Sequence, residues 1–101
     1  MTVRFKISPR AGQQIRTASK WWIANRTAAP TMLVDELEAA YTLIVDMPFA
    51  GEGVPHSRIS GLRRVLLGRT QHYLYYVVSE DAAVVEVLSL WHTSRGRPPR
   101  L

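Results

Sequence analysis

The hydrophobic pattern of this chain changes its period at Gly61, and this change limits the folds that the sequence can adopt. From Gly61 onward the pattern is typical of strands, in three apolar segments that read GLRRVLLG, HYLYYVVS and AVVEVLSLW. Short polar breaks at residues 69–71 and 79–81 separate them. Three β-rich segments at such close spacing predict an antiparallel meander. Both faces of the second and third segments are largely apolar, so we expect the sheet to be covered on one side and at least partly on the other.

Before Gly61 the apolar residues recur with the period of helices. Ser8 and Pro9 are typical of a helix start, since Ser can cap free amides and Pro suits the first helical position. A first helix is expected from Pro9 to about Arg26 and a second from Pro30 to about Asp46 or Met47, because Pro30 can begin a helix but not continue one. The apolar residues of each helix step by four, three and four and form one stripe: Ala11, Ile15, Ala18 and Trp22 in the first, and Leu33, Leu37, Ala40 and Ile44 in the second.

The alternating segment at residues 2–7 supplies one further strand, with Val3, Phe5 and Ile7 on one face. The order is therefore strand, two helices, three strands (β-α-α-β-β-β). We predict an α+β fold in which a helical hairpin packs on a four-stranded, mainly antiparallel sheet, with the first strand at the edge of the meander. At 101 residues the chain has the size of one domain, spanning 1–101. Its basic end, residues 92–101, is expected to be a mobile tail.

Composition excludes several classes of protein. The chain has no Cys, so it has no disulfide framework and no thiolate metal site, and His56 and His72 have no second ligand at a suitable spacing. We predict no metal and no cofactor. No apolar run approaches the ~20 residues that cross a bilayer and no signal peptide is evident, which favours a cytoplasmic protein without membrane contact.

Charge is unevenly distributed along the sequence. Thirteen Lys and Arg against eight Asp and Glu give a formal net charge of +5, yet residues 27–57 hold no Lys or Arg and five of the carboxylates. A field of this sign attracts polyanions, either nucleic acid or an acidic protein segment. A basic surface that serves only solubility is the alternative.

The order of these segments resembles the ParE/RelE superfamily of toxins from type II toxin–antitoxin systems. The features that carry the resemblance are an opening strand that runs into Ser-Pro-Arg, a second helix that ends in Met47-Pro48, loop glycines, a strand with paired arginines, a Tyr-rich strand, and a last strand that ends near His and Arg (VVEVLSLWHTSRGRPP). The resemblance covers nearly the whole chain.

The resemblance implies a cytoplasmic toxin that a cognate antitoxin neutralises with a flexible, often acidic segment. It also implies two possible targets. ParE-like members poison DNA gyrase, whereas RelE-like members are ribosome-dependent endoribonucleases that cut mRNA. The fold does not choose between them.

Five residues are candidates for RNA cleavage, which needs a proton-transfer group and cations for the developing phosphorane charge, but no metal: Arg63, Arg64, Arg69, His92 and Arg95. Alternation sends Arg63 and Arg64 to opposite faces, and the pattern does not decide which of them shares a site with Arg69. His92 is the candidate for proton transfer, because an imidazole side chain can both donate and accept a proton. Arginines at the sheet rim that pair with antitoxin carboxylates, and a structural His92, are the competing interpretations.

The ribonuclease match is incomplete, because Thr93 follows His92 where some nuclease members have Tyr. The sequence therefore favours growth inhibition through a ParE-like target such as gyrase. A metal-independent mRNA endoribonuclease and a non-catalytic basic nucleic-acid-binding module are the alternatives.

Aromatic residues supply the remaining candidates. Tyr73, Tyr75 and Tyr76 can stack on nucleobases if they are exposed, although in a chain this small at least two of them are expected in the core. Trp22 fits the core stripe, so the adjacent Trp21 is the candidate contact for an antitoxin or for a second copy in a dimer, with simple packing at the edge of the core as the alternative. Arg4 and Lys6, on the polar face of the first strand, are further candidates for a partner.

Overall fold

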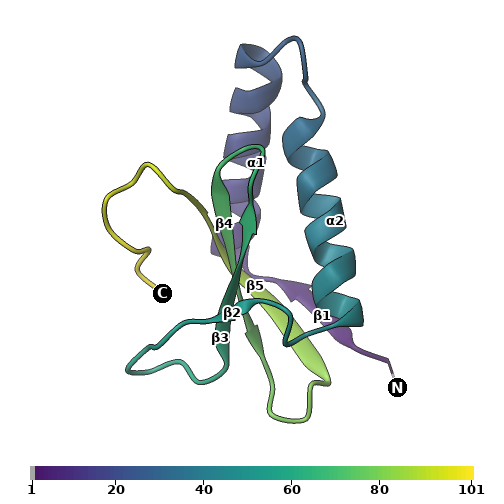
Figure 1. Cartoon of the computed structure of the whole chain (residues 1–101), viewed down its shortest axis with the longest axis vertical. Helices are drawn as coiled ribbons and strands as arrows, with labels where there is room; N and C mark the ends of the chain where they lie inside the picture. Colours follow the sequence, from purple (N-terminus) through teal and green to yellow (C-terminus); the bar gives the residue numbers. More distant parts are fainter. Residues whose placement is uncertain (1) are drawn as a thin grey trace.

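Two antiparallel helices pack on one face of a five-stranded mixed sheet (Figure 1). The computed structural model describes residues 2–101. The elements follow in the order β1 (Arg4–Ile7), α1 (Pro9–Asn25), α2 (Met32–Asp46), β2 (Glu52–Gly53), β3 (Leu62–Leu67), β4 (His72–Val78) and β5 (Val84–His92). The predicted α+β class and element order are confirmed. The predicted number of four strands is wrong, because β2 adds a two-residue strand that pairs Glu52 with Arg64 and Gly53 with Arg63. So short a strand has no period to detect.

The strand order across the sheet is β1-β5-β4-β3-β2. β3, β4 and β5 form the predicted antiparallel meander. β1 lies at the edge, as predicted, and runs parallel to β5, with Arg4 opposite Val84 and Ile7 opposite Val87. Backbone hydrogen bonds from Arg4 N to Ala83 O and from Ser8 N to Val87 O lie at the two ends of this pairing. The backbone groups of Phe5 and Ile7 therefore point to the free edge.

The helix ends follow from local chemistry. Ser8 Oγ accepts a hydrogen bond from Ala11 N at 3.1 Å, and Pro9 occupies the first turn of α1. At the other end, Trp22 Nε1 donates to Ala29 O at 2.9 Å and fastens the loop that leads to α2. α2 begins two residues after Pro30, and Thr31 Oγ1 donates to Asp35 Oδ2. The hairpin predicted from the two apolar stripes is confirmed.

The core lies between the helices and one face of the sheet. Four residues of α2 are buried at the predicted spacing, whereas α1 buries Ala11 and Trp22 and buries Ile15 and Ala18 only partly. The strands contribute Leu67, Leu74, Tyr76, Val78, Val85, Val87 and Leu90.

Leu88 is an extra residue in β5. Tyr75 pairs with Ser89 and Tyr76 pairs with Val87, so Leu88 has no partner on β4 and forms a β-bulge. Because of this bulge, Val85 and Val87 share the helix-facing side with Leu90 and His92, which strict alternation would have sent to the other side.

Tyr76 joins the sheet to the loop after α2. Its hydroxyl, on a fully buried side chain, donates to Pro48 O at 2.8 Å and accepts from Gly51 N at 2.9 Å. A Cβ atom on Gly51 would lie 2.5 Å from that hydroxyl and 2.9 Å from Arg64 O, so only glycine fits there.

Replacing Tyr76 with Phe removes the hydroxyl and leaves the Gly51 N–H and the Pro48 carbonyl without their partner in a buried site. We expect the free energy of unfolding to fall by about 1–3 kcal/mol, measured by urea denaturation. Tyr73→Phe is the matched control, because the Tyr73 hydroxyl makes no hydrogen bond within residues 2–101 and its loss should change stability by less than about 0.5 kcal/mol. Equal effects of the two variants would contradict this role of Tyr76.

Candidate functional site

The paired arginines of β3 point to opposite faces of the sheet, as alternation predicts. Arg63 lies opposite Tyr76 on the helix side, and its guanidinium donates to Phe49 O at 3.1 Å and to Gly51 O at 2.6 Å. Its Cζ also lies 5.1 Å from the centroid of the Phe49 ring. Arg63 therefore holds the loop after α2 against β3.

Arg64 lies on the face of the sheet that the helices leave free. Its Nε forms an ion pair with Glu52 Oε1 at 2.5 Å, and its Nη1 donates to the Tyr75 hydroxyl at 3.2 Å. These hydrogen bonds, the one to Tyr75 first and the one to Glu52 second, raise the pKa of Arg64, so it stays cationic. Its Cζ sits 4.0 Å from the centroid of the Tyr73 ring.

Arg69 lies in the turn between β3 and β4, away from both of these sites. The turn is docked on α2 by the carboxylate of Glu36, which accepts from Arg69 N at 3.0 Å and from Thr70 N at 2.8 Å. The three arginines of this strand and turn are therefore not brought to one point.

The tyrosines of β4 offer little ring surface to a nucleobase. Tyr76 is fully buried and Tyr75 is 3 % exposed, so these two candidate rings are not open to a nucleobase, in line with the expectation that at least two of the three tyrosines lie in the core. Tyr76 is buried because the even-numbered residues of β4 face the helices. Tyr73 and Tyr75 lie on the opposite face of β4, where the Arg64 guanidinium covers their rings. Tyr73 is partly exposed, with Arg64 over its ring.

A groove of about 720 Å³ runs between α1 and the ends of β4 and β5. Trp21, Trp22 and Arg26 line it from the end of α1, His72, Leu90 and His92 from the sheet, and residues 93–95 from the chain after β5. Trp21 is 49 % exposed, with the Arg26 guanidinium 5.0 Å from its ring centroid. Gln14, also in this groove, has its Oε1 accepting from Leu90 N at 2.9 Å, which ties α1 to β5.

Two histidines meet in this groove. His72 and His92 are directly opposite in the β4–β5 register, and their rings pack edge to face with centroids 4.9 Å apart. The Nδ1 atom of His92 accepts from Ser94 N at 3.0 Å, and the Nδ1 atom of His72 lies 3.1 Å from Thr70 Oγ1. Sequence reasoning missed this pair, because the register and the bulge at Leu88 cannot be read from the pattern.

A smaller hollow of about 250 Å³ lies on the helix-free face. Its walls are Arg64, Tyr73 and Tyr75 from β3 and β4, Trp91 from β5, and residues 93 and 95–98 from the tail. The Arg95 and Arg97 guanidiniums lie 4.3 and 5.7 Å from the Trp91 ring centroid. Arg97 was not among the predicted site residues.

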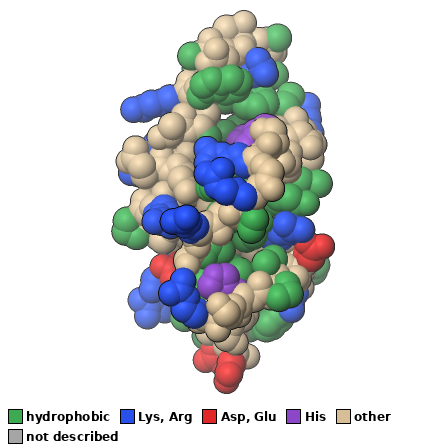
Figure 2. Space-filling view, turned by 90° about the vertical axis from the view of Figure 1, so that its left-hand side faces the viewer, with side chains coloured by type: hydrophobic (Ala, Val, Ile, Leu, Met, Phe, Trp, Pro, Cys, Tyr) green, Lys and Arg blue, Asp and Glu red, His purple; other side chains and the backbone are tan. Residues whose placement is uncertain are grey.

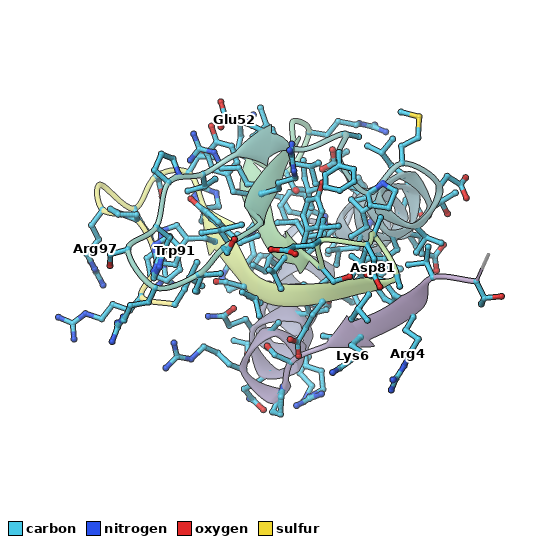
Figure 3. All side chains as sticks on the ribbon, turned by 90° about the horizontal axis from the view of Figure 1, so that it is seen from below. Arg4, Lys6, Glu52, Asp81, Trp91 and Arg97 are labelled. Carbon is cyan, nitrogen blue, oxygen red and sulfur yellow. The ribbon has the colours of Figure 1, made fainter. Side chains whose placement is uncertain are left out.

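Arg4 and Lys6 are exposed on the edge strand β1, far from Trp91 and Arg97 (Figure 3). Trp21 lies 12 residues into α1, about 18 Å along the helix from its start. The three predicted partner contacts therefore do not form one patch.

Two further observations concern the described residues 2–101. Among them, no group of three or more His, Cys, Asp or Glu side chains could hold a metal ion. None of their helices has the length and apolar character needed to cross a membrane.

Comparison with known proteins identifies the class. Over residues 5–97 the chain matches the family model described as the ParE toxin of the type II toxin–antitoxin system parDE. The chain therefore belongs to the ParE toxin family. No curated protein sequence matches it.

Solved structures of related toxins share this fold at low sequence identity. The chromosomal ParDE system of P. aeruginosa aligns with a TM-score of 0.68 at 14 % identity, covering 90 % of this chain and 96 % of that one. A mutant of the E. coli toxin RelE in the free state aligns with a TM-score of 0.62 at 15 % identity, covering 95 % of this chain and 88 % of that one. The RelBE2 toxin–antitoxin complex of Mycobacterium tuberculosis aligns with a TM-score of 0.60 at 15 % identity, covering 91 % of this chain and 99 % of that one.

Burial of His72 makes the stability of the protein depend on pH. Desolvation, and then the nearby His92, lower the pKa of His72 from 6.5 to about 4, with Arg95 acting in the same direction and Glu36 against it. Between pH 6.5 and 4 the unfolded chain binds a proton that the folded chain does not. Stability should therefore fall as the pH falls through this window, by on the order of 1–3 kcal/mol from this group.

The measurement is urea denaturation at pH 7.0, 5.5 and 4.5, comparing the wild type with His72→Asn. The Asn variant should lose less stability on acidification, whatever its stability at pH 7. His56→Asn is the control, because His56 is only partly buried in the loop before β3 and an Asn Oδ1 can accept the bonds that its Nδ1 accepts from Arg58 N and Ile59 N. A wild type and a His72→Asn variant with the same pH dependence would disprove the assignment.

Proposed function

We propose that this toxin inhibits bacterial growth in the cytoplasm by binding a protein target, such as DNA gyrase, rather than by cutting mRNA. One observation carries the proposal: the candidate proton-transfer group His92 and the candidate phosphate-binding Arg64 lie on opposite faces of the sheet. Cleavage by internal transfer needs both kinds of group within reach of one phosphate. Membership of the ParE family supports a gyrase-like target, as the resemblance implies.

The paired arginines of β3, which are candidates for phosphate binding, are already bound to other groups of the protein. Arg63 is bound to two loop carbonyls, and Arg64 to Glu52 and Tyr75. Both observations favour structural roles for the two arginines.

A metal-independent endoribonuclease is the second candidate function. The observation that favours it is the groove beside α1, where His92 and Arg95 lie together with His72. This arrangement lacks the strand arginines, which is why we rank it second.

We further propose that a cognate antitoxin occupies this groove with an acidic segment that carries apolar side chains. Trp21, Trp22 and Leu90 offer apolar surface, while Arg26 offers positive charge without a carboxylate partner among residues 2–101. The similar structures include complexes of toxins with antitoxins. A groove of about 720 Å³ has room for several side chains of such a segment.

Induction of the protein alone in bacteria tests the target. We expect growth arrest with a DNA-damage response and intact mRNA, and we expect His92→Ala, if folded, to remain as toxic as the parent. RNA sequencing of 5′ ends and a DNA-damage reporter measure the two outcomes. Rapid cleavage of mRNA within codons, abolished by His92→Ala, would overturn the proposal in favour of the ribonuclease.

The antitoxin site is tested by co-expressing the toxin with the protein encoded in the neighbouring reading frame. Trp21→Ala should keep its toxicity but need about tenfold more antitoxin for rescue, since a buried aromatic contact contributes about 1–2 kcal/mol or more. Ile23→Ala is the matched control, because Ile23 is 54 % exposed on the same helix and does not line the groove. Equal rescue of both variants would show that the antitoxin binds elsewhere.

A further inference from the structure

Three exposed apolar side chains lie together where α2 ends. Among residues 2–101, Leu43, Met47 and Phe49 are 39, 56 and 52 % exposed. Leu43 and Met47 are four residues apart on one side of the helix end, and Phe49 follows in the turn that Ala50 N closes on Met47 O at 2.9 Å. Apolar residues that are exposed singly are normal, whereas a contiguous group marks an interaction surface. These three residues form the α2-end patch.

The turn that carries Phe49 is held in place by the sheet. The Tyr76 hydroxyl binds Pro48 O and Gly51 N, and the Arg63 guanidinium donates to Phe49 O and Gly51 O. The backbone from residue 48 to residue 51 is therefore fixed, and yet the Phe49 ring remains about half exposed. A ring that is already held in an outward position lowers the entropic cost of binding a partner.

Negative charge borders the α2-end patch. Asp46 is exposed beside Leu43 and Met47, and the exposed Asp35 continues the same outward stripe of α2 eleven residues earlier. Neither carboxylate forms an ion pair among residues 2–101, and residues 27–57 contain no Lys or Arg. The cation that contacts the patch is Arg63, whose guanidinium is bound to two loop carbonyls.

The end of α2 has a charge arrangement that does not favour helix stability. The C-terminal end of a helix carries partial negative charge and is stabilised by cations. α2 has no basic residue in its last turn and ends on Asp46 instead. Pro48 has no N–H to donate to the Ile44 carbonyl, so the last carbonyls of α2 add to the negative potential. Local arrangements that cost stability are expected at functional sites.

Other parts of the surface carry the opposite charge. Figure 2 shows the side of the molecule away from α2, with Lys and Arg side chains across its middle and Asp and Glu mostly towards its margins. The groove proposed for the antitoxin lies along the later part of α1, at the other end of the helical hairpin, and has Arg26 beside its two tryptophans. An acidic antitoxin segment matches that groove but is repelled by the α2-end patch.

We propose that the α2-end patch docks the protein target of the toxin, through a segment of the target that carries Lys or Arg beside apolar side chains. The cations of this segment meet Asp46 and the carbonyls at the end of α2, while its apolar side chains cover Leu43, Met47 and Phe49. The flexible Met47 side chain adapts to the shape of its partner. The inference rests on the proposed function in that the target is a protein, and it adds the surface and the chemistry by which that target is bound.

The apolar contacts are tested with the full chain, by inhibition of supercoiling by purified DNA gyrase and by growth arrest on induction. Met47→Ser with Phe49→Ser should raise the concentration for half inhibition by about tenfold or more, since truncating a central apolar contact commonly weakens binding by this factor. Val34→Ser is the matched control, because Val34 is 38 % exposed on the same helix, nine residues before Leu43. It should change inhibition by less than about twofold.

A charge reversal separates docking from folding. Asp46→Lys places a cation at the end of α2, so the midpoint of thermal unfolding should rise, while inhibition should weaken by about three- to tenfold. Glu80→Lys changes the net charge equally in the exposed turn between β4 and β5, and should leave inhibition within about twofold of the wild type. A variant that is more stable but less inhibitory does not owe its loss to misfolding.

The other possible occupants give different results. Both α2-end variants should still bind the protein encoded in the neighbouring reading frame, because the groove is unchanged. Loss of that binding with toxicity unchanged would assign the patch to the antitoxin. A wild-type dimer that the serine pair converts to a monomer, again with toxicity unchanged, would assign it to a second copy of the chain. Either result, or a serine pair that inhibits gyrase like the wild type, contradicts the inference and leaves the gyrase proposal standing.

Failure of the proposed function has its own signature. A wild type that cuts mRNA and leaves gyrase uninhibited contradicts the proposed target. The growth assay then decides the α2-end patch separately. A serine pair as toxic as Val34→Ser contradicts the patch, whereas a folded serine pair with reduced toxicity supports docking on a different target.

Discussion

The unpaired residue Leu88 in β5 decides which side chains meet in this protein. Without it, Val85 and Val87 would share a face with Ser89 and Trp91, and the helices would cover a tryptophan and a serine. With it, Leu90 completes the core and His92 comes to lie opposite His72, while Trp91 moves to the free face. The two candidate sites, the groove under α1 and the hollow beside Trp91, are consequences of this one extra residue.

The sheet separates two kinds of chemistry. On the helix side, Arg63 and Tyr76 are used to fasten the loop after α2, and the histidines lie in the groove. On the other side, Arg64 stacks on Tyr73, and the arginines of the tail line the same hollow as Arg64. A reaction that needs a histidine and a strand arginine at one phosphate is not favoured by this division, whereas binding of two different partners is.

Much of the fold could be predicted from the sequence, because the helices and the meander depend on periods that extend over many residues. The apolar stripe of α2, from Leu33 to Ile44, and the helix start at Ser8 and Pro9 are examples. The site was less predictable, since the pairing of His72 with His92 depends on register and on one bulge, which leave no trace in composition. The same holds for β2, whose two residues are a strand because Arg63 and Arg64 are their neighbours. Alternation did predict that Arg63 and Arg64 diverge, although it did not predict what each of them contacts.

Arg95 links the groove and the hollow, because it lines both. In the structure its guanidinium stacks on Trp91, on the side of the hollow, and Arg26 is then the nearer cation for an acidic segment beside Trp21. A single guanidinium can satisfy only one of two anions that lie on different faces of a sheet. An anion held in the hollow therefore removes positive charge from the groove, and an acidic segment that draws Arg95 into the groove removes it from the hollow. Since a cation–π contact contributes about 0.5–2 kcal/mol, the exchange of Trp91 for a carboxylate partner is within reach of ordinary binding energies.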